Sequence, residues 1–199
     1  MQQKSRYRPI LFAIALGVLI FGVSQYMTGV IGLPARNWER DLEAAKVSLS
    51  NRQDAYQRFT SLTAAELPAI ECKDYGFARA CANEALALAP RFRQDWNYGN
   101  AIHDSHVVLG RLALKQNDVA AARNELLLAG QTPGSPQLNS FGPNMSLAKD
   151  LLSRGQRDVV LQYFDQCQGF WRSDYGALAK WRFLVRIHLP PDFGTHLLH

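Results

Sequence analysis

The residues best suited to chemistry in this chain of 199 residues are two histidines three positions apart, His103 and His106. That spacing places both side chains on one face of a helix, where two imidazoles could hold a metal ion. No His-Glu-x-x-His pattern is present, and the sequence identifies no third ligand. On a helical wheel both lie within about 40° of Gly110, the small residue against which a partner helix would pack. We therefore favour packing at a helix seam, and a metal-dependent enzyme is the alternative.

Other motifs that carry chemistry are missing from the sequence. It contains no glycine-rich phosphate loop and no G-x-S-x-G nucleophile elbow. Beyond Lys4, Arg6 and Arg8 near the N-terminus, 19 basic residues face 17 acidic ones, which is too balanced for the basic footprint of nucleic-acid binding. We expect no catalytic residue, no cofactor, no nucleic acid and no small-molecule substrate. The protein is predicted not to be an enzyme.

Both histidines lie in the first of two predicted helical hairpins, near residues 101–130. The second hairpin follows near residues 145–171. A shift of 38 positions superimposes one hairpin on the other. The superimposed pairs are Gly110 with Ala148, Ala113 with Leu151, Asn117 with Gly155, Ala122 with Val160, Leu126 with Phe164, and Ala129 with Cys167. Small residues fall where two helices would touch, and large apolar ones line the same faces, as in stacked helical repeats. The loop between the hairpins, Gly130 to Asn144, contains Leu138 and Phe141 and should pack against the domain.

The first hairpin resembles a tetratricopeptide repeat (TPR). The positions of that pattern are occupied by His106, Leu109, Gly110, Ala113, Asn117, Asp118, Ala122, Leu126, Ala129 and Pro133. His106 stands where tryptophan is usual, and Ala113 stands where tyrosine is usual. The second hairpin matches through Leu147, Ala148, Leu151, Gly155, Val160, Phe164 and Cys167. The segment TPGSPQLNSFGPNMSLAKDLL is also similar to one in bacterial repeat proteins of unassigned function. The resemblance to TPR proteins implies a scaffold that binds peptides or proteins on a concave helical face.

The remaining sequence also favours helices, and no strand pattern of useful length is present. Further helices are expected over Asn37–Thr60, Tyr75–Leu88 and Asp174–Leu189. Thr63 and Glu66 have the spacing of a capping box, but Pro68 limits that segment to a short turn. The predicted fold class is therefore all-α, with a TPR-like domain.

The three cysteines, Cys72, Cys81 and Cys167, match no zinc knuckle, Cys-x-x-Cys redox pair or haem attachment site. Outside the cytoplasm, one disulfide and one buried thiol are expected. Cys167 takes the small buried position of Ala129, so it should be the free thiol and Cys72 should pair with Cys81. This pairing requires the chain to fold back around Asp74, because a continuous helix would hold the two cysteines too far apart. Three unpaired buried thiols are the alternative.

The N-terminus carries the one apolar run of membrane length, residues 9–33. About 20 helical residues span a bilayer core, and this run is longer. The basic tail, residues 1–8, should stay in the cytoplasm by the positive-inside rule, which places residues 34–199 outside. The length of the run and the poor cleavage site around Pro34 favour an uncleaved signal anchor over a cleaved signal peptide.

One face of this predicted transmembrane helix carries Ser24, Thr28 and Gly32, with Gln25 beside them. Small residues spaced by four allow close helix approach, and glutamine can hydrogen-bond across a helix interface. The four residues could therefore pack against another transmembrane helix. We favour the alternative that they only approach the outer headgroup region, because all lie in the outer half of the run.

Together these features predict a single-pass protein of the bacterial cytoplasmic (inner) membrane, with its N-terminus in the cytoplasm and a periplasmic TPR-like domain. Our leading hypothesis is a membrane-anchored interaction module, or an accessory subunit of a membrane complex, that recruits a protein partner through its helical-repeat surface. One alternative is a metal-dependent enzyme that uses His103 and His106. Another is a purely structural subunit that docks through its transmembrane helix.

Overall fold

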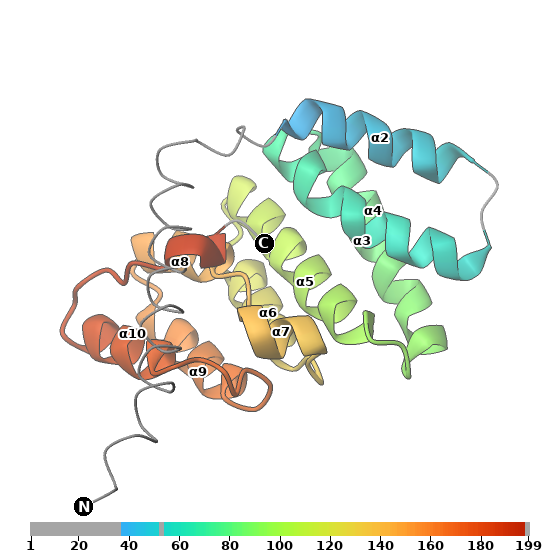
Figure 1. Cartoon of the computed structure of the whole chain (residues 1–199). Helices are drawn as coiled ribbons and strands as arrows, with labels where there is room; N and C mark the ends of the chain where they lie inside the picture. Colours follow the sequence, from blue (N-terminus) through green and yellow to red (C-terminus); the bar gives the residue numbers. More distant parts are fainter. Residues whose placement is uncertain (1–36, 52–53, 198–199) are drawn as a thin grey trace, which may run out of the picture. The chain divides into compact units, whose positions relative to one another are not determined.

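The computed structural model describes residues 37–51 and 54–197, which form helices joined by short connections with no β-strand among them (Figure 1). The α-helices are α2 (Trp38–Ser50), α3 (Ala55–Glu71), α4 (Tyr75–Leu88), α5 (Tyr98–Lys115), α6 (Val119–Gly130), α7 (Pro136–Phe141), α8 (Ser146–Ser153), α9 (Arg157–Cys167) and α10 (Ala177–Arg186). Two 3-10 helices are η1 (Ala89–Phe92) and η2 (Gly194–Leu197). The all-α class is confirmed for this part of the chain.

Three helical hairpins, α3/α4, α5/α6 and α8/α9, share one turn geometry. The central turn residue has a positive φ in each, at 62° for Lys73, 59° for Asn117 and 75° for Gly155. The next residue donates its backbone N–H to the carbonyl five positions earlier. These bonds join Asp74 to Ala69 (2.9 Å), Asp118 to Ala113 (2.9 Å) and Gln156 to Leu151 (3.0 Å). The chain therefore reverses in the same way three times.

The α3/α4 hairpin is a repeat unit that the sequence analysis missed. Its shift from α5/α6 is 44 positions, which places Ala78, Ala82 and Ala85 on Ala122, Leu126 and Ala129. All six of these residues are fully buried. Alanine is a weak hydrophobic signal that appears on both faces of many helices, so this periodicity is hard to recognise without the turn geometry.

The helix expected over Asn37–Thr60 is two helices, and this prediction was wrong. α2 ends at Ser50, and α3 begins at Ala55 after Asp54, whose side chain accepts a hydrogen bond from the Gln57 backbone N–H at 2.8 Å. Aspartate at such a position satisfies an orphan N–H of the first turn and so begins a new helix. The apolar pattern continued across the break because both helices bury a face in the same domain.

Pro68 does not limit its segment to a short turn, contrary to the sequence analysis. It lies inside α3, and its carbonyl accepts a hydrogen bond from the Cys72 N–H at 2.9 Å, so the helix continues to Glu71. A proline removes one backbone donor from a helix but keeps its acceptor. Glu66 is therefore a mid-helix residue and not part of a capping box.

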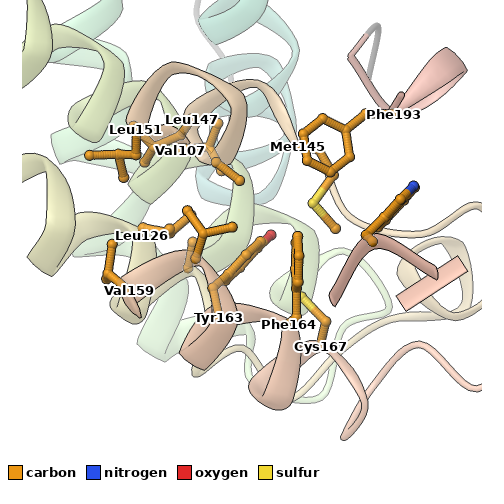
Figure 2. Close-up of a cluster of buried hydrophobic side chains, with 14 of the residues drawn as sticks. Val107, Leu126, Met145, Leu147, Leu151, Val159, Tyr163, Phe164, Cys167 and Phe193 are labelled. Atoms are coloured by element: carbon orange, nitrogen blue, oxygen red, sulfur yellow. The ribbon is translucent and has the colours of Figure 1, made fainter. Parts of the chain in front are cut away.

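α5 is the central helix of the domain, and it packs against α3 and α4 on one side and α6, α7 and α8 on the other (Figure 1). The largest hydrophobic cluster lies in the C-terminal half and is built from α5, α6, α8, α9 and α10 (Figure 2). Its fully buried members include Leu126, Met145, Leu151, Tyr163 and Phe164. The clusters among α2, α3, α4 and one face of α5 are smaller, and half of their buried residues are alanine.

α5 approaches its neighbouring helices closely at Gly110. A Cβ atom added there would lie 2.3 Å from Leu147 Cδ2 and 3.1 Å from Glu125 Cβ. Leu147 is fully buried, so its side chain could move away only by displacing its neighbours in the core. Glycine thus allows α5 to approach α6 and α8 together, which is the helix seam expected beside His106.

The residues after α10 fold back onto the large cluster. Phe193 is buried, with its ring centroid 4.9 Å from that of Trp181 and 6.3 Å from that of Phe164. The Trp181 indole N–H donates to the Asp192 carbonyl at 3.1 Å, and the Met145 N–H donates to the His196 carbonyl at 2.8 Å. This C-terminal segment is therefore part of the core and joins α10 to the start of α8.

Candidate binding cleft

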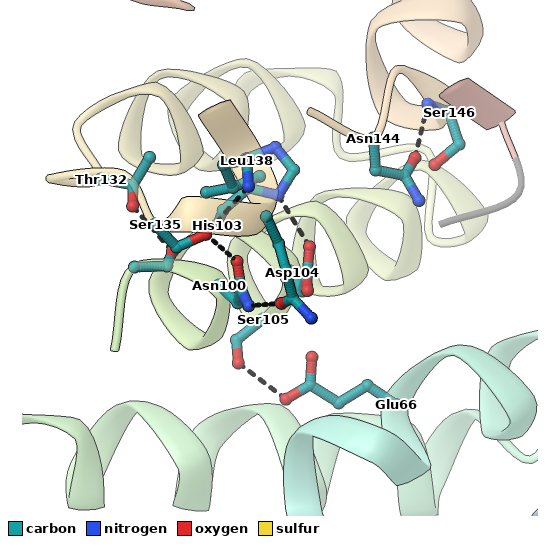
Figure 3. Close-up of polar contacts among 12 residues, drawn as sticks. Glu66, Asn100, His103, Asp104, Ser105, Thr132, Ser135, Leu138, Asn144 and Ser146 are labelled. Carbon is teal, nitrogen blue, oxygen red and sulfur yellow. Dashed lines mark hydrogen bonds and ion pairs between the residues drawn. The ribbon is translucent and has the colours of Figure 1, made fainter. Parts of the chain in front are cut away.

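The N-terminal half of α5 carries a network of polar side chains that fixes the loop between α6 and α8. Asn100 is buried, and its amide nitrogen donates to Asn97 Oδ1 at 3.1 Å and to Gln137 Oε1. Its Oδ1 atom accepts from the Ser135 hydroxyl at 2.5 Å (Figure 3). Ser135 also caps α7, because its hydroxyl oxygen accepts from the Leu138 N–H at 2.9 Å. One asparagine thereby ties α7 to α5.

The start of this loop lies directly on the backbone of α5. The Thr132 hydroxyl donates to the Gly99 carbonyl at 2.7 Å. A Cβ atom at Gly99 would lie 1.9 Å from the Gly134 carbonyl oxygen, so only glycine permits the approach. Leu138 is buried in the large cluster. The loop is therefore packed against the domain, and it contains one short helix, α7.

A cleft of about 210 Å³ opens between α5, α7 and the residues that lead into α8. Its lining residues are Asn100, Asp104, Gln137, Leu138, Phe141, Gly142 and Asn144. Asp104 is the only charged residue among them. Leu138 and Phe141 form an apolar wall, and the Phe141 side chain is 65% exposed. The cleft therefore combines one negative charge, an open aromatic ring and several amides.

His103 connects Asp104 of the cleft to the interior of the domain. Its ring is fully buried, with Nδ1 2.7 Å from Asp104 Oδ1 and Nε2 2.9 Å from the Tyr163 hydroxyl (Figure 3). Burial raises the pKa of Tyr163 well above 10, so its phenol stays protonated and can donate to Nε2. The Nδ1–H then donates to the Asp104 carboxylate. Both ring nitrogens are thus engaged by protein groups.

His106 contacts a different helix and does not share a ligand position with His103. Its Nδ1 lies 2.7 Å from Glu125 Oε2 of α6, beside the Gly110 contact. Among the residues that the structure describes, no group of three or more His, Cys, Asp or Glu side chains could hold a metal ion. The two histidines that the spacing brought together on one face therefore serve separate interhelix contacts.

Glu66 is the titratable residue that the sequence analysis misjudged most. It is fully buried between α3 and α5, and its Oε1 accepts from the Ser105 hydroxyl at 2.7 Å (Figure 3). Its Oε2 is buried with no hydrogen-bond partner in the described part of the chain. Burial is the main cause that raises its pKa well above 4.5. The Ser105 hydrogen bond lowers this pKa, and the nearby Asp104 charge raises it. No local pattern could reveal this, since Ser105 lies 39 positions away.

The three cysteines are free thiols in the structure. The chain folds back at Lys73 and Asp74, as pairing of Cys72 with Cys81 requires. Cys81 lies six residues into α4 and is buried, whereas Cys72 is only partly buried. The Cys72–Cys81 disulfide stays a prediction.

Burial makes two of these thiols unreactive. It raises the pKa of Cys81 to about 12, and it raises the pKa of the fully buried Cys167 as well. The thiolate is the reactive form of cysteine, so neither residue is a suitable nucleophile near neutral pH. Cys167 occupies the buried position that Ala129 has in the preceding hairpin.

The predicted anchor, residues 9–33, lies outside the described residues, and so do Ser24, Gln25, Thr28 and Gly32. Among the helices that the structure describes, none is long and apolar enough to cross a membrane. Comparisons of this chain with protein-family models, with curated proteins and with solved structures find no match.

Proposed function

We propose that this protein is a membrane-anchored, TPR-like interaction module that recruits a protein partner, alone or as an accessory subunit of a membrane complex. The observation that carries the proposal is the succession of three hairpins with one turn geometry, packed side by side around α5. Hairpins that stack in this way create an extended surface, and such surfaces bind other proteins in helical-repeat scaffolds.

The cleft beside α5 supports a binding role over a catalytic one. Its polar groups are held in place by Asn100, Ser135 and His103, and its aromatic wall is exposed. An exposed aromatic ring beside polar groups of fixed orientation is typical of a contact surface. Because both nitrogens of His103 are already engaged, the metal-dependent alternative gains no support and is not proposed.

The membrane part of the proposal rests on the apolar run at residues 9–33 and on the basic tail that precedes it. The described domain begins at α2 within five residues of that run. A partner recruited by the domain would therefore be held close to the outer face of the membrane.

The test is purification of the full-length tagged protein from bacterial membranes in mild detergent, with identification of the proteins that accompany it. A second sample carries only residues 1–36 fused to an unrelated soluble domain. We expect a recurring partner, in near-stoichiometric amount, with the full chain and not with the fusion. If the same partner accompanies both, the chain docks through its span as a structural subunit. If no partner accompanies the full chain, the proposal is wrong.

A further inference from the structure

We infer that the cleft between α5, α7 and the start of α8 binds a lysine or arginine side chain of the partner, with Asp104 as its counter-charge. This inference rests on the proposed function and specifies the chemistry of the partner. It is carried by three features of the cleft: its charge, its apolar wall and its unpartnered amide groups.

The charge of the cleft comes from Asp104 alone among its lining residues. Oδ1 of this residue faces the His103 ring at 2.7 Å, while Oδ2 has no partner in the described chain. The side chain is 42% exposed, so a ligand can reach it. His103 fixes the orientation of the carboxylate, and the open oxygen is left as an acceptor for a cation. A phosphate or carboxylate ligand would meet repulsion here.

The size and apolar wall of the cleft suit a long aliphatic stem. A volume of about 210 Å³ is enough for one extended side chain but too small for a folded element of a partner. Lysine and arginine bury their methylene groups along apolar surfaces while their charged ends reach polar groups. Leu138 and Phe141 provide that surface, and the exposed Phe141 ring can also stack against a cation.

The amide groups of the cleft indicate a peptide and not a free amine. Gln137 accepts from Asn100 through Oε1, and Asn144 accepts from the Ser146 N–H through Oδ1 at 2.8 Å (Figure 3). These bonds fix the oxygen of each amide, so each nitrogen is a donor with no partner in the described chain. Two such donors beside a carboxylate fit the backbone carbonyls that flank a basic side chain in an extended peptide.

The first experiment measures binding of short fluorescent peptides to the full-length protein in detergent micelles. Each peptide consists of glycine and serine around one central residue, which is arginine, lysine, norleucine or glutamate. We expect the arginine and lysine peptides to bind at least fivefold more tightly than the norleucine peptide, and the glutamate peptide to bind most weakly. Higher salt should reduce this preference. Equal binding of arginine and norleucine, or no binding of any peptide, overturns the inference.

Variants separate the role of the cleft from a general effect on folding. Asp104→Asn keeps an acceptor for the His103 ring but loses the charge, so it should weaken arginine-peptide binding about fivefold and leave norleucine-peptide binding unchanged. Phe141→Ala should weaken both. Asp158→Asn, at an exposed aspartate in the first turn of α9, is the matched control and should change neither. Unchanged arginine binding in Asp104→Asn contradicts the inference.

Co-purification of the same full-length variants distinguishes this inference from the proposed function. Loss of the partner in Asp104→Asn and Phe141→Ala, but not in Asp158→Asn, supports the cleft as the docking site. A partner that stays with both cleft variants overturns the inference and leaves the proposed function standing. Absence of any partner from the wild-type chain contradicts the proposed function itself.

Discussion

At the scale of single residues, the absence of a Cβ atom at Gly110 allows α5 to approach α6 and α8 closely. The sequence analysis identified it as the small residue at a helix seam, because small residues recur at that position of stacked hairpins. In the structure, the residues that pack against Gly110 are Leu147 and Glu125. Those partners could not be named from the sequence, since they lie on two other helices. The seam is thus a local feature whose neighbours depend on the whole fold.

Gly110→Ala should therefore destabilise the domain, although alanine favours helices. The added Cβ would lie 2.3 Å from a fully buried leucine, and overpacking of this kind costs about 1–3 kcal/mol. Gly76→Ala in α4 is the matched control, because a Cβ there meets nothing within 4 Å. It should leave stability unchanged or raise it by up to about 1 kcal/mol. Urea unfolding measures the free energy of unfolding of both variants. A change of the same sign in both would contradict a close helix contact at Gly110.

Glu66 makes stability depend on pH in the direction opposite to that of most carboxylates. The unfolded chain loses this proton near pH 4.5, whereas burial holds the folded pKa well above that value. Between the two pKa values the folded state keeps a proton that the unfolded state has released. Stability should therefore be full below pH 4.5 and fall as the pH rises, by at most about 1.4 kcal/mol per pH unit.

Glu66→Gln should remove that dependence, because glutamine keeps an acceptor for Ser105 and carries no titrating proton. We expect the variant and the wild type to be similarly stable at pH 4, and the variant to be the more stable at pH 8. Thermal unfolding across this pH range provides the measurement. Parallel curves for the two proteins would mean that Glu66 ionises in the folded state as readily as in the unfolded chain.

At the scale of elements, the hairpins α5/α6 and α8/α9 were predictable from the sequence, and the hairpin α3/α4 was not. Asn117 and Gly155, which a 38-residue shift pairs, adopt the same left-handed turn. The equivalent turn at Lys73 escaped notice because the helices around it bury alanines. The cleft could not be predicted either, since its polar groups come from α5, α7 and the loop before α8, which only the fold brings together.

The C-terminal segment, residues 187–197, belongs to the core although its one regular element is the short helix η2. Phe193 is 2% exposed and contacts the rings of Phe164 and Trp181. Phe193→Ala should lower stability by about 3–5 kcal/mol, as other buried aromatic truncations do. Leu189→Ala, at a side chain that is 51% exposed, should change it by less than about 0.5 kcal/mol. Denaturant unfolding compares the two, and similar values would place this segment outside the core.

At the scale of the whole molecule, the charge asymmetry around residues 9–33 predicts the orientation of the proposed membrane anchor. A reporter that is active only outside the cytoplasm should be active when it is fused after His199. Protease added to the outside of spheroplasts should then remove the domain. Activity of a cytoplasm-only reporter at the same position would reverse the orientation and would also remove the oxidising environment that a disulfide needs.

The redox state of the three thiols is a separate property of the whole molecule. Non-reducing peptide mapping of the isolated full-length protein tests the pairing of Cys72 with Cys81. A linked pair would confirm the predicted disulfide, whereas three free thiols would match the structure. Cys167 should stay free in either case, because it is fully buried beside Tyr163. Its presence in a bridge would contradict the position assigned to α9.

The uneven core has a further consequence for how the domain opens. Half of the buried residues that hold α2, α3 and α4 together are alanines, whereas α5, α6, α8 and α9 share a larger cluster rich in leucines and aromatic rings. Because a buried alanine contributes far less free energy than a buried leucine or aromatic ring, backbone amides of the first three helices should exchange with deuterium sooner. If residues 9–33 anchor the protein as proposed, a force applied through them would reach α2 before the rest of the domain. α2, α3 and α4 would then unfold before the helices that line the cleft.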